Sequence, residues 1–199
     1  MKTVDNILVQ LNETLQSAKF GLNDVLDGPV ERKASGLKNL TVWGRAVTNV
    51  IQNLKNITDG FDEWYAPIQD EMRNDELLRF FYERRSLHLK EGAVKVARKA
   101  YIADLSELQK IPKPKNAKGF FMGDENGGSG WIVQGENGKE EKVYVEVPPE
   151  LGHSSSEFID PPSIHLGKKI DDTSIENLCK LYYAYFDYLV SKTIKKFKN

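Results

Sequence analysis

Arg84, Arg85 and His88 are the residues of this chain whose types and spacing could do chemistry. Residues 84 and 88 are one helical turn apart, so a guanidinium and an imidazole could converge on a single anion. A histidine can move a proton near neutral pH, and an arginine can stabilise charge that builds on phosphate oxygens. The pattern would suit cleavage of a phosphodiester, with His88 as acid–base and Arg84 or Arg85 as the phosphate clamp.

A helix expected from Asp75 to Lys90 must position these side chains, with Asn74 or Asp75 as its N-cap. At ~100° per residue, its solvated flank consists of Glu76, Arg79, Glu83, Ser86 and Lys90. Arg84, Arg85 and His88 fall instead among leucines and phenylalanines. Burying an unpaired guanidinium costs several kcal/mol. We therefore expect the cluster to have acidic partners inside the fold, or to line a cleft or an interface.

Three roles for this cluster follow from the residues. Arg84 and Arg85 could pair with carboxylates such as Asp59, Asp62 or Asp70, because bidentate arginine–carboxylate pairs fix the register of neighbouring helices. The cluster could instead form a surface that binds a partner. The third role is catalysis.

The segment from Leu77 to His88, LLRFFYERRSLH, resembles the arginine–histidine helix of the HEPN family. The resemblance implies a multi-helix bundle that is commonly dimeric. It also implies a metal-independent ribonuclease, or a non-catalytic relative, of bacterial toxin–antitoxin and phage-defence systems. The family's active motif separates arginine and histidine by more than the three residues that lie between Arg84 and His88. This departure counts against nuclease activity.

Composition narrows the class of protein. The 28 basic and 29 acidic side chains of the 199 residues nearly cancel, which gives no global electrostatic case for nucleic acid or an anionic membrane. Cys179 is the single cysteine, so an internal disulfide and a cysteine-based zinc site are excluded. We expect no signal peptide, and no stretch of the sequence has the ~20 consecutive apolar residues of a membrane span. We expect a cytoplasmic protein of bacterial type that does not bind a membrane.

Helical periodicity dominates the N-terminal part. Apolar residues recur at helical spacing in residues 3–20, and Gly21, Asp27, Gly28 and Pro29 are expected to break that pattern. A second helix is expected over residues 30–57, where Gly44 indicates the close approach of another helix. Pro67 is expected in the first turn of a further helix. Near the other end of the chain, Thr173 to Glu176 reads as a capping box that starts a C-terminal helix.

The middle of the chain is richer in strand signals. Residues 131–134 and 141–147 flank Asn137–Gly138, which predicts a β-hairpin. Residues 94–102 favour an extended segment, and residues 110–118 favour a stiff, solvated connector. Residues 148–168 favour irregular structure.

These elements predict a mainly α (α+β) fold, a multi-helix bundle with a small β-hairpin or β-meander inserted between the fourth helix and the C-terminal helix. We expect a single domain over 1–199. Its parts are N-terminal helices over 1–92, a β-rich and irregular insertion over 93–168, and a helix over 172–197 that packs back on the bundle.

Other candidate sites are aromatic or metal-binding. Trp64 and Tyr65, with Phe61, are expected to cap one end of the bundle core, or to form an exposed platform for a ligand. Trp131 is the basis for a small-ligand site beneath the hairpin. His153, Asp160 and His165 match no zinc pattern, so we expect no metal and no cofactor.

The sequence therefore favours a non-enzymatic helical-bundle protein that acts by macromolecular binding or self-association. A protein partner or a homodimer is expected, RNA is a possible partner, and a defence or toxin–antitoxin setting fits the resemblance. The alternative is a metal-independent ribonuclease that uses Arg84 or Arg85 with His88.

Overall fold

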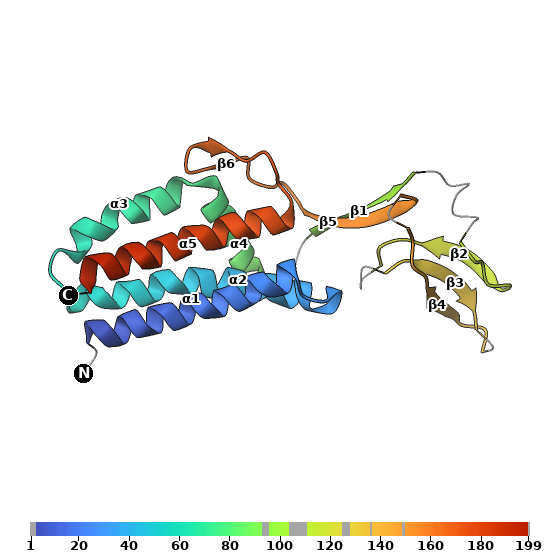
Figure 1. Cartoon of the computed structure of the whole chain (residues 1–199), viewed down its shortest axis with the longest axis horizontal. Coiled ribbons are helices and arrows are strands. Elements are labelled where there is room, and N and C mark those ends of the chain that lie inside the picture. The colour runs from blue at the N-terminus through green and yellow to red at the C-terminus, as the bar shows by residue number, and fades with distance from the viewer. Residues whose placement is uncertain are drawn as a thin grey trace. The chain divides into compact units, whose positions relative to one another are not determined.

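The computed structural model describes residues 3–92, 96–103, 111–124, 128–135, 137–148 and 150–198 (Figure 1). It is mainly helical, with small antiparallel sheets between the fourth helix and the C-terminal helix, so the predicted fold class is confirmed. The chain forms two compact units. A helical unit comprises residues 1–95 and 160–199, and a β unit comprises residues 96–159. The expectation that both belong to a single domain stays a prediction.

Helices α1 (Val4–Leu26) and α2 (Val30–Ile51) form an antiparallel hairpin. Thr3 caps α1 by accepting a hydrogen bond from the Asn6 amide at 3.3 Å. The break predicted at Asp27, Gly28 and Pro29 is confirmed, whereas the break predicted at Gly21 is wrong, because α1 continues to Leu26. A Cβ atom on Gly21 would lie 2.4 Å from the backbone nitrogen of Leu40, so this glycine allows α1 and α2 to approach closely.

The 3₁₀-helix η1 (Gln52–Asn56) leads to α3 (Phe61–Asn74), which is followed by α4 (Glu76–Glu91). Pro67 lies inside α3 and not in its first turn, because the helix begins six residues earlier, after Gly60 with its φ of 67°. Asp75 caps α4 as predicted, since its carboxylate accepts a hydrogen bond from the Leu78 amide at 2.9 Å. Gly92 ends α4 in the left-handed region, with a φ of 66°.

The C-terminal helix α5 (Ile175–Phe197) lies alongside the other helices (Figure 1). Its N-cap is Ser174, whose hydroxyl accepts from the Asn177 amide, so the cap lies one residue after the predicted Thr173. Tyr182 of α5 is 1% exposed and stacks on Phe81 of α4 at 4.2 Å between ring centroids. The close approach predicted at Gly44 is confirmed, because a Cβ atom there would lie 2.6 Å from the Tyr182 ring.

The β unit contains two antiparallel sheets. Strands β2 (Ala117–Phe121), β3 (Gly130–Gln134) and β4 (Glu140–Tyr144) form a meander, and the hairpin predicted around Asn137–Gly138 joins β3 to β4. Strand β1 (Val96–Ile102) pairs with β5 (Gly152–Phe158). The extended segment predicted near β1 is confirmed from Val96 onward, whereas Val94 lies outside the described residues.

Two predictions for the middle of the chain are wrong in part. Residues 148–168 are not largely irregular, because they contain β5 and the short pair β6 (Ile164–His165) and β7 (Lys168–Lys169). The connector predicted up to Lys118 ends earlier, since β2 begins at Ala117, and its first residue, Lys110, lies outside the described part.

Candidate functional site

The rotation of α4 about its axis turns Arg84 and His88 inward, as predicted. Arg84 is 8% exposed and His88 is 7% exposed, whereas Glu76, Arg79 and Lys90 lie on the solvated flank. Neighbouring turns of α4 also bury Leu77, Leu78 and Phe81 among the other helices. Two of the three predicted catalytic side chains, Arg84 and His88, therefore sit in the packed interior of the helical unit.

Arg84 lies close to an aromatic ring and to an acidic residue. Its guanidinium carbon lies 4.2 Å from the centroid of the Phe80 ring, a geometry that favours a cation–π contact. Burial lowers the pKa of Arg84, and the nearby charge of Asp160 raises it. Arg84 remains charged at neutral pH, and Asp160 is an acidic neighbour that helps to compensate its burial.

His88 is held in its neutral form by the same environment. Burial lowers its pKa, and the positive charges of Lys38 and Arg84 lower it further. The Nδ1 atom of His88 is buried and makes no hydrogen bond with the described residues. Lys38 of α2 donates a hydrogen bond to the carbonyl of Gly92, so it satisfies the C-terminal end of α4.

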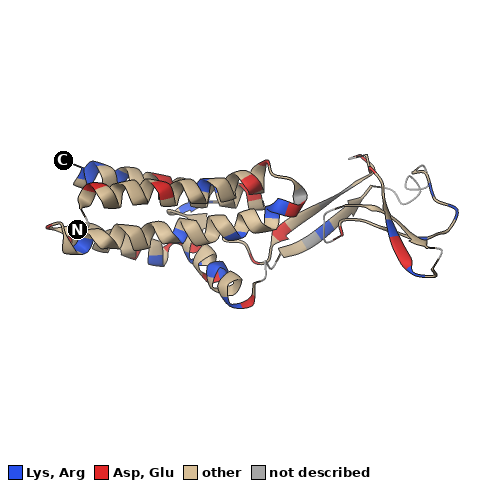
Figure 2. Ribbon diagram, turned by 90° about the horizontal axis from the view of Figure 1, so that it is seen from below, with Lys and Arg blue, Asp and Glu red and all other residues tan. Residues whose placement is uncertain are grey.

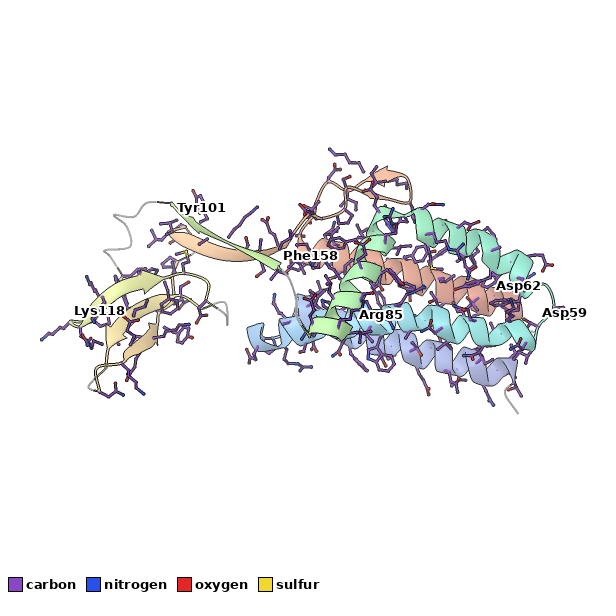
Figure 3. The ribbon with its side chains drawn as sticks, turned by 180° about the vertical axis from the view of Figure 1, so that it is seen from behind. Asp59, Asp62, Arg85, Tyr101, Lys118 and Phe158 are labelled. Atoms are coloured by element: carbon purple, nitrogen blue, oxygen red, sulfur yellow. The ribbon has the colours of Figure 1, made fainter. Side chains whose placement is uncertain are left out.

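Arg85 is half-buried on the same helix, and its Nε atom makes no hydrogen bond with the described residues. The acidic partners predicted for the two arginines lie elsewhere. Figure 3 places Asp59 and Asp62 at the far end of the bundle from Arg85. Asp62 pairs with Lys55 at 3.1 Å, and Asp70 pairs with Arg73 at 3.3 Å. Their closeness in sequence to α4 does not bring them to its inner face.

The aromatic residues of α3 pack together at one end of the helical unit. Trp64 is half-buried and meets Phe197 edge-on at 5.0 Å between centroids, while the rings of Phe61 and Tyr65 lie 5.1 Å apart. Tyr65 is only 3% exposed. These contacts confirm the predicted cap on the bundle core.

Trp131 lies in the core of the β unit. It is 7% exposed, packs edge-on against Phe120 at 4.9 Å between centroids, and shares its cluster with Ile111 and Val133. Lys113 lies 5.6 Å from the indole centroid. These contacts give the Trp131 ring a packing role, and its predicted part in ligand binding stays a prediction.

Of the three residues considered for a metal, the structure describes the surroundings of His165 and Asp160, and these two side chains have other neighbours. His165 Nδ1 lies 3.0 Å from the carboxylate of Asp75, whereas Asp160 faces Arg84. The side chain of His153 lies outside what the structure describes. Within the described part of the chain, no group of three or more potential ligands could hold a metal ion.

Sequence reasoning missed a cavity of about 420 Å³ among α2, α3, α4 and α5. Arg84 and His88 do not line it, but Tyr65 does. The cavity also presents Arg45, which follows Gly44 on α2. The full lining is Arg45, Gln52, Tyr65, Gln69, Met72, Arg73, Leu78, Arg79, Tyr82, Glu83, Tyr182 and Phe186.

The outer side of α4 carries exposed apolar side chains. Tyr82 is 51% exposed and Leu89 is 58% exposed. They are seven residues apart, so they lie on the same side of the helix two turns from one another. Ser86 lies between them and is half-exposed. We refer to Tyr82, Ser86 and Leu89 as the α4 outer face.

Charge is distributed without segregation over the described residues. Figure 2 shows basic and acidic positions interspersed along the helices, in keeping with the nearly balanced composition. None of the described helices combines the length and the apolar run that crossing a membrane requires.

Comparison with known proteins gives one similarity. Residues 35–126 match the family described as bacteriophage lambda protein ea47. The matched stretch begins in α2 and includes all of α3 and α4, so Arg45, Tyr82 and His88 lie within it. No curated protein and no solved structure matches the chain. This chain is thus similar, over residues 35–126, to a family of bacteriophage proteins.

Proposed function

We propose that this chain is a phage-associated protein that acts in the bacterial cytoplasm by binding a protein partner through the α4 outer face. The family similarity supports the phage association, and it covers the whole of α4. The observation that carries the binding role is the exposure of Tyr82 and Leu89 on one side of that helix. Tyrosine is enriched at protein interfaces, where its ring contributes contact area at low entropic cost.

The contacts of the inner side of α4 support a packing role for that side, which leaves the outer face for the partner. Arg84 and His88 are buried against Phe80 and the charges of Asp160 and Lys38, so both side chains contribute to the packing of the unit. In this proposal α4 packs against the other helices with its inner side and binds the partner with the α4 outer face. A defence or toxin–antitoxin role would be exerted through that partner.

Replacing both exposed apolar residues tests this proposal. We expect the double variant Tyr82→Ser, Leu89→Ser to reduce capture of the partner at least about tenfold, because exposed aromatic anchors carry much of an interface's energy. The measurement is quantitative pull-down by the tagged full chain from cells that carry a lambda-type phage, with light scattering of the purified chain. A dimer that is lost in the double variant would identify the partner as a second copy.

The matched control is Val9→Ser with Tyr188→Ser, whose side chains are 56% and 60% exposed on α1 and α5. Both double variants should melt close to the parent, because surface substitutions change stability by about 0.5 kcal/mol or less. A strict monomer that retains no partner would contradict the proposal. So would equal loss of capture in the two double variants.

A second proposal is the ribonuclease activity implied by the HEPN resemblance. It is favoured by one observation, the proximity of Arg84 and Lys38 to His88, because the positive charges of both residues act on the His88 imidazole. In this role His88 would move the proton and Arg84 would hold a phosphate. The two proposals differ in whether the purified chain cuts RNA, so an RNA-cleavage assay with a metal chelator present decides between them.

A further inference from the structure

Arg45 brings an uncompensated positive charge to the cavity among α2, α3, α4 and α5. Its side chain is half-buried, and its Nη1 atom donates a hydrogen bond to the Thr48 hydroxyl at 2.8 Å. Its guanidinium carbon lies 5.6 Å from the centroid of the Tyr82 ring. Among the described residues, no carboxylate lies within 4.0 Å of Arg45. A guanidinium has five N–H donors, so Arg45 keeps donors that a bound acceptor could take.

Tyr65 lines the same cavity and carries a second hydrogen-bond donor. Its hydroxyl is buried near Gln52 and Thr48 but completes no hydrogen bond of ordinary geometry with the described residues. Burial raises the pKa of Tyr65, although the charge of Arg45 acts in the opposite direction. The phenol therefore keeps its proton at neutral pH. A buried hydroxyl without a partner is unfavourable, and an acceptor that bound in the cavity and reached it would remove that cost.

The remaining lining combines positive charge with apolar surface. Arg73 and Arg79 also line the cavity, and Glu83 is the single acidic residue of the lining. Arg73 is partly offset by Asp70 at 3.3 Å. The apolar part of the lining is formed by Met72, Leu78 and Phe186. The excess of positive charge in the lining favours an anion. The apolar residues of the lining favour a ligand with a hydrocarbon or aromatic body.

We propose that this cavity binds a small organic anion, whose carboxylate or phosphate accepts hydrogen bonds from Arg45 and Tyr65 while its apolar body contacts Leu78 and Phe186. A volume of about 420 Å³ is within the usual range for small-molecule sites. The ligand class follows from unused donors on two different helices that line one cavity. The proposal does not depend on a protein partner at the α4 outer face.

Isothermal titration of the full chain with three probes tests the ligand class. Phenyl phosphate and 3-phenylpropionate carry the two oxyanion groups on a similar body, and 3-phenylpropanol is the neutral control. We expect both anions to bind with a Kd of about 1 mM or below, and the alcohol to bind at least about tenfold more weakly. The tighter of the two anions identifies the preferred group. No heat from either anion, or binding of the alcohol as tight as that of the anions, would overturn the proposal.

Two variants locate the bound anion within the cavity. Arg45→Gln should weaken binding of the tighter anion about 10- to 100-fold, because it removes a charge-assisted hydrogen bond. Tyr65→Phe keeps the ring and should weaken binding about three- to tenfold. Arg32→Gln is the matched control, since Arg32 pairs with Asp24 at 2.7 Å and does not line the cavity.

The thermal midpoint of each variant without ligand shows whether the helical unit is intact. Tyr65→Phe removes one hydroxyl, so it keeps the test informative even where Arg45→Gln disturbs the packing of α2. Binding that is unchanged in both cavity variants would overturn the assignment. Equal weakening in Arg32→Gln would do the same, because it would indicate a general effect of lost positive charge.

Discussion

Replacing Gly44 with leucine is expected to lower the free energy of unfolding by about 3 kcal/mol or more, because the new side chain would overpack the core. A Cβ atom at position 44 would lie 2.6 Å from Cε1 of Tyr182 and 3.2 Å from its hydroxyl oxygen. The ring cannot retreat easily. It is stacked on Phe81 at 4.2 Å, and its hydroxyl donates to the carbonyl of Thr41 at 3.3 Å.

Thermal unfolding followed by circular dichroism measures this effect. For a chain of 199 residues, ~3 kcal/mol corresponds to a fall in Tm of roughly 6–12 °C. Asn49→Leu is the control, since it adds the same leucine at an exposed position of α2 and should leave Tm nearly unchanged. A Gly44→Leu variant that melts with the parent would show that α2 and α5 do not meet at this glycine.

Asp75→Ala is expected to cost about 3–5 kcal/mol of stability at pH 7, because it removes a helix cap and leaves several buried hydrogen-bond donors without their acceptor. The Asp75 carboxylate accepts from the amide of Leu78 at 2.9 Å and from the amide of Leu166 at 2.7 Å. His165 Nδ1 lies 3.0 Å from the same carboxylate. This one side chain thus caps α4 and ties it to the segment of β6 and β7.

The loss of stability in Asp75→Ala should become smaller as the pH falls. Burial raises the pKa of Asp75, but the hydrogen bonds from His165, Leu166 and Leu78 outweigh it, so the pKa is lowered overall. A carboxyl group with a lowered pKa in the folded state stabilises the fold above its unfolded pKa of ~3.9 and loses that contribution as pH falls through the folded value. The difference between parent and variant should therefore shrink below pH ~4.

Urea unfolding at neutral and acidic pH measures both parts of this prediction. Asp70→Ala is the matched control, because Asp70 forms an exposed pair with Arg73 that should contribute about 1 kcal/mol or less. An Asp75→Ala variant as stable as the parent at pH 7 would show that the carboxylate does not hold α4 in place. A difference that persists unchanged at acidic pH would contradict the direction of the pKa.

The helical unit was predictable because its signals are local. The apolar spacing of Leu77, Leu78 and Phe81 determined the rotation of α4, and the cap at Asp75 depends on short-range chemistry. Strand β5 escaped prediction for the opposite reason. Its sequence, Gly152–Phe158, has serines where alternating apolar residues would signal a strand, and its backbone is satisfied by pairing with β1.

The candidate site was predictable only in part. The burial of Arg84 and His88 followed from helical phase, but Asp160 did not emerge as a neighbour because the β unit separates it from α4 along the chain. The cavity was missed for a related reason. Arg45 and Tyr65 lie on different helices, and no spacing rule within one helix reports that two side chains line one space. The break predicted at Gly21 was wrong because this glycine lies where α1 packs closely against Leu40 of α2.

We propose that the inner side of α4 contributes to packing of the helical unit and does not cut RNA. The most direct measurement is cleavage of a mixed-sequence RNA by the purified full chain in the presence of a metal chelator, with His88→Ala and Lys90→Ala beside the parent. Lys90 is exposed on the same helix and provides the matched control. We expect no cleavage above background by any of the three proteins. Cleavage by the parent and Lys90→Ala that disappears in His88→Ala would contradict this proposal and establish the ribonuclease.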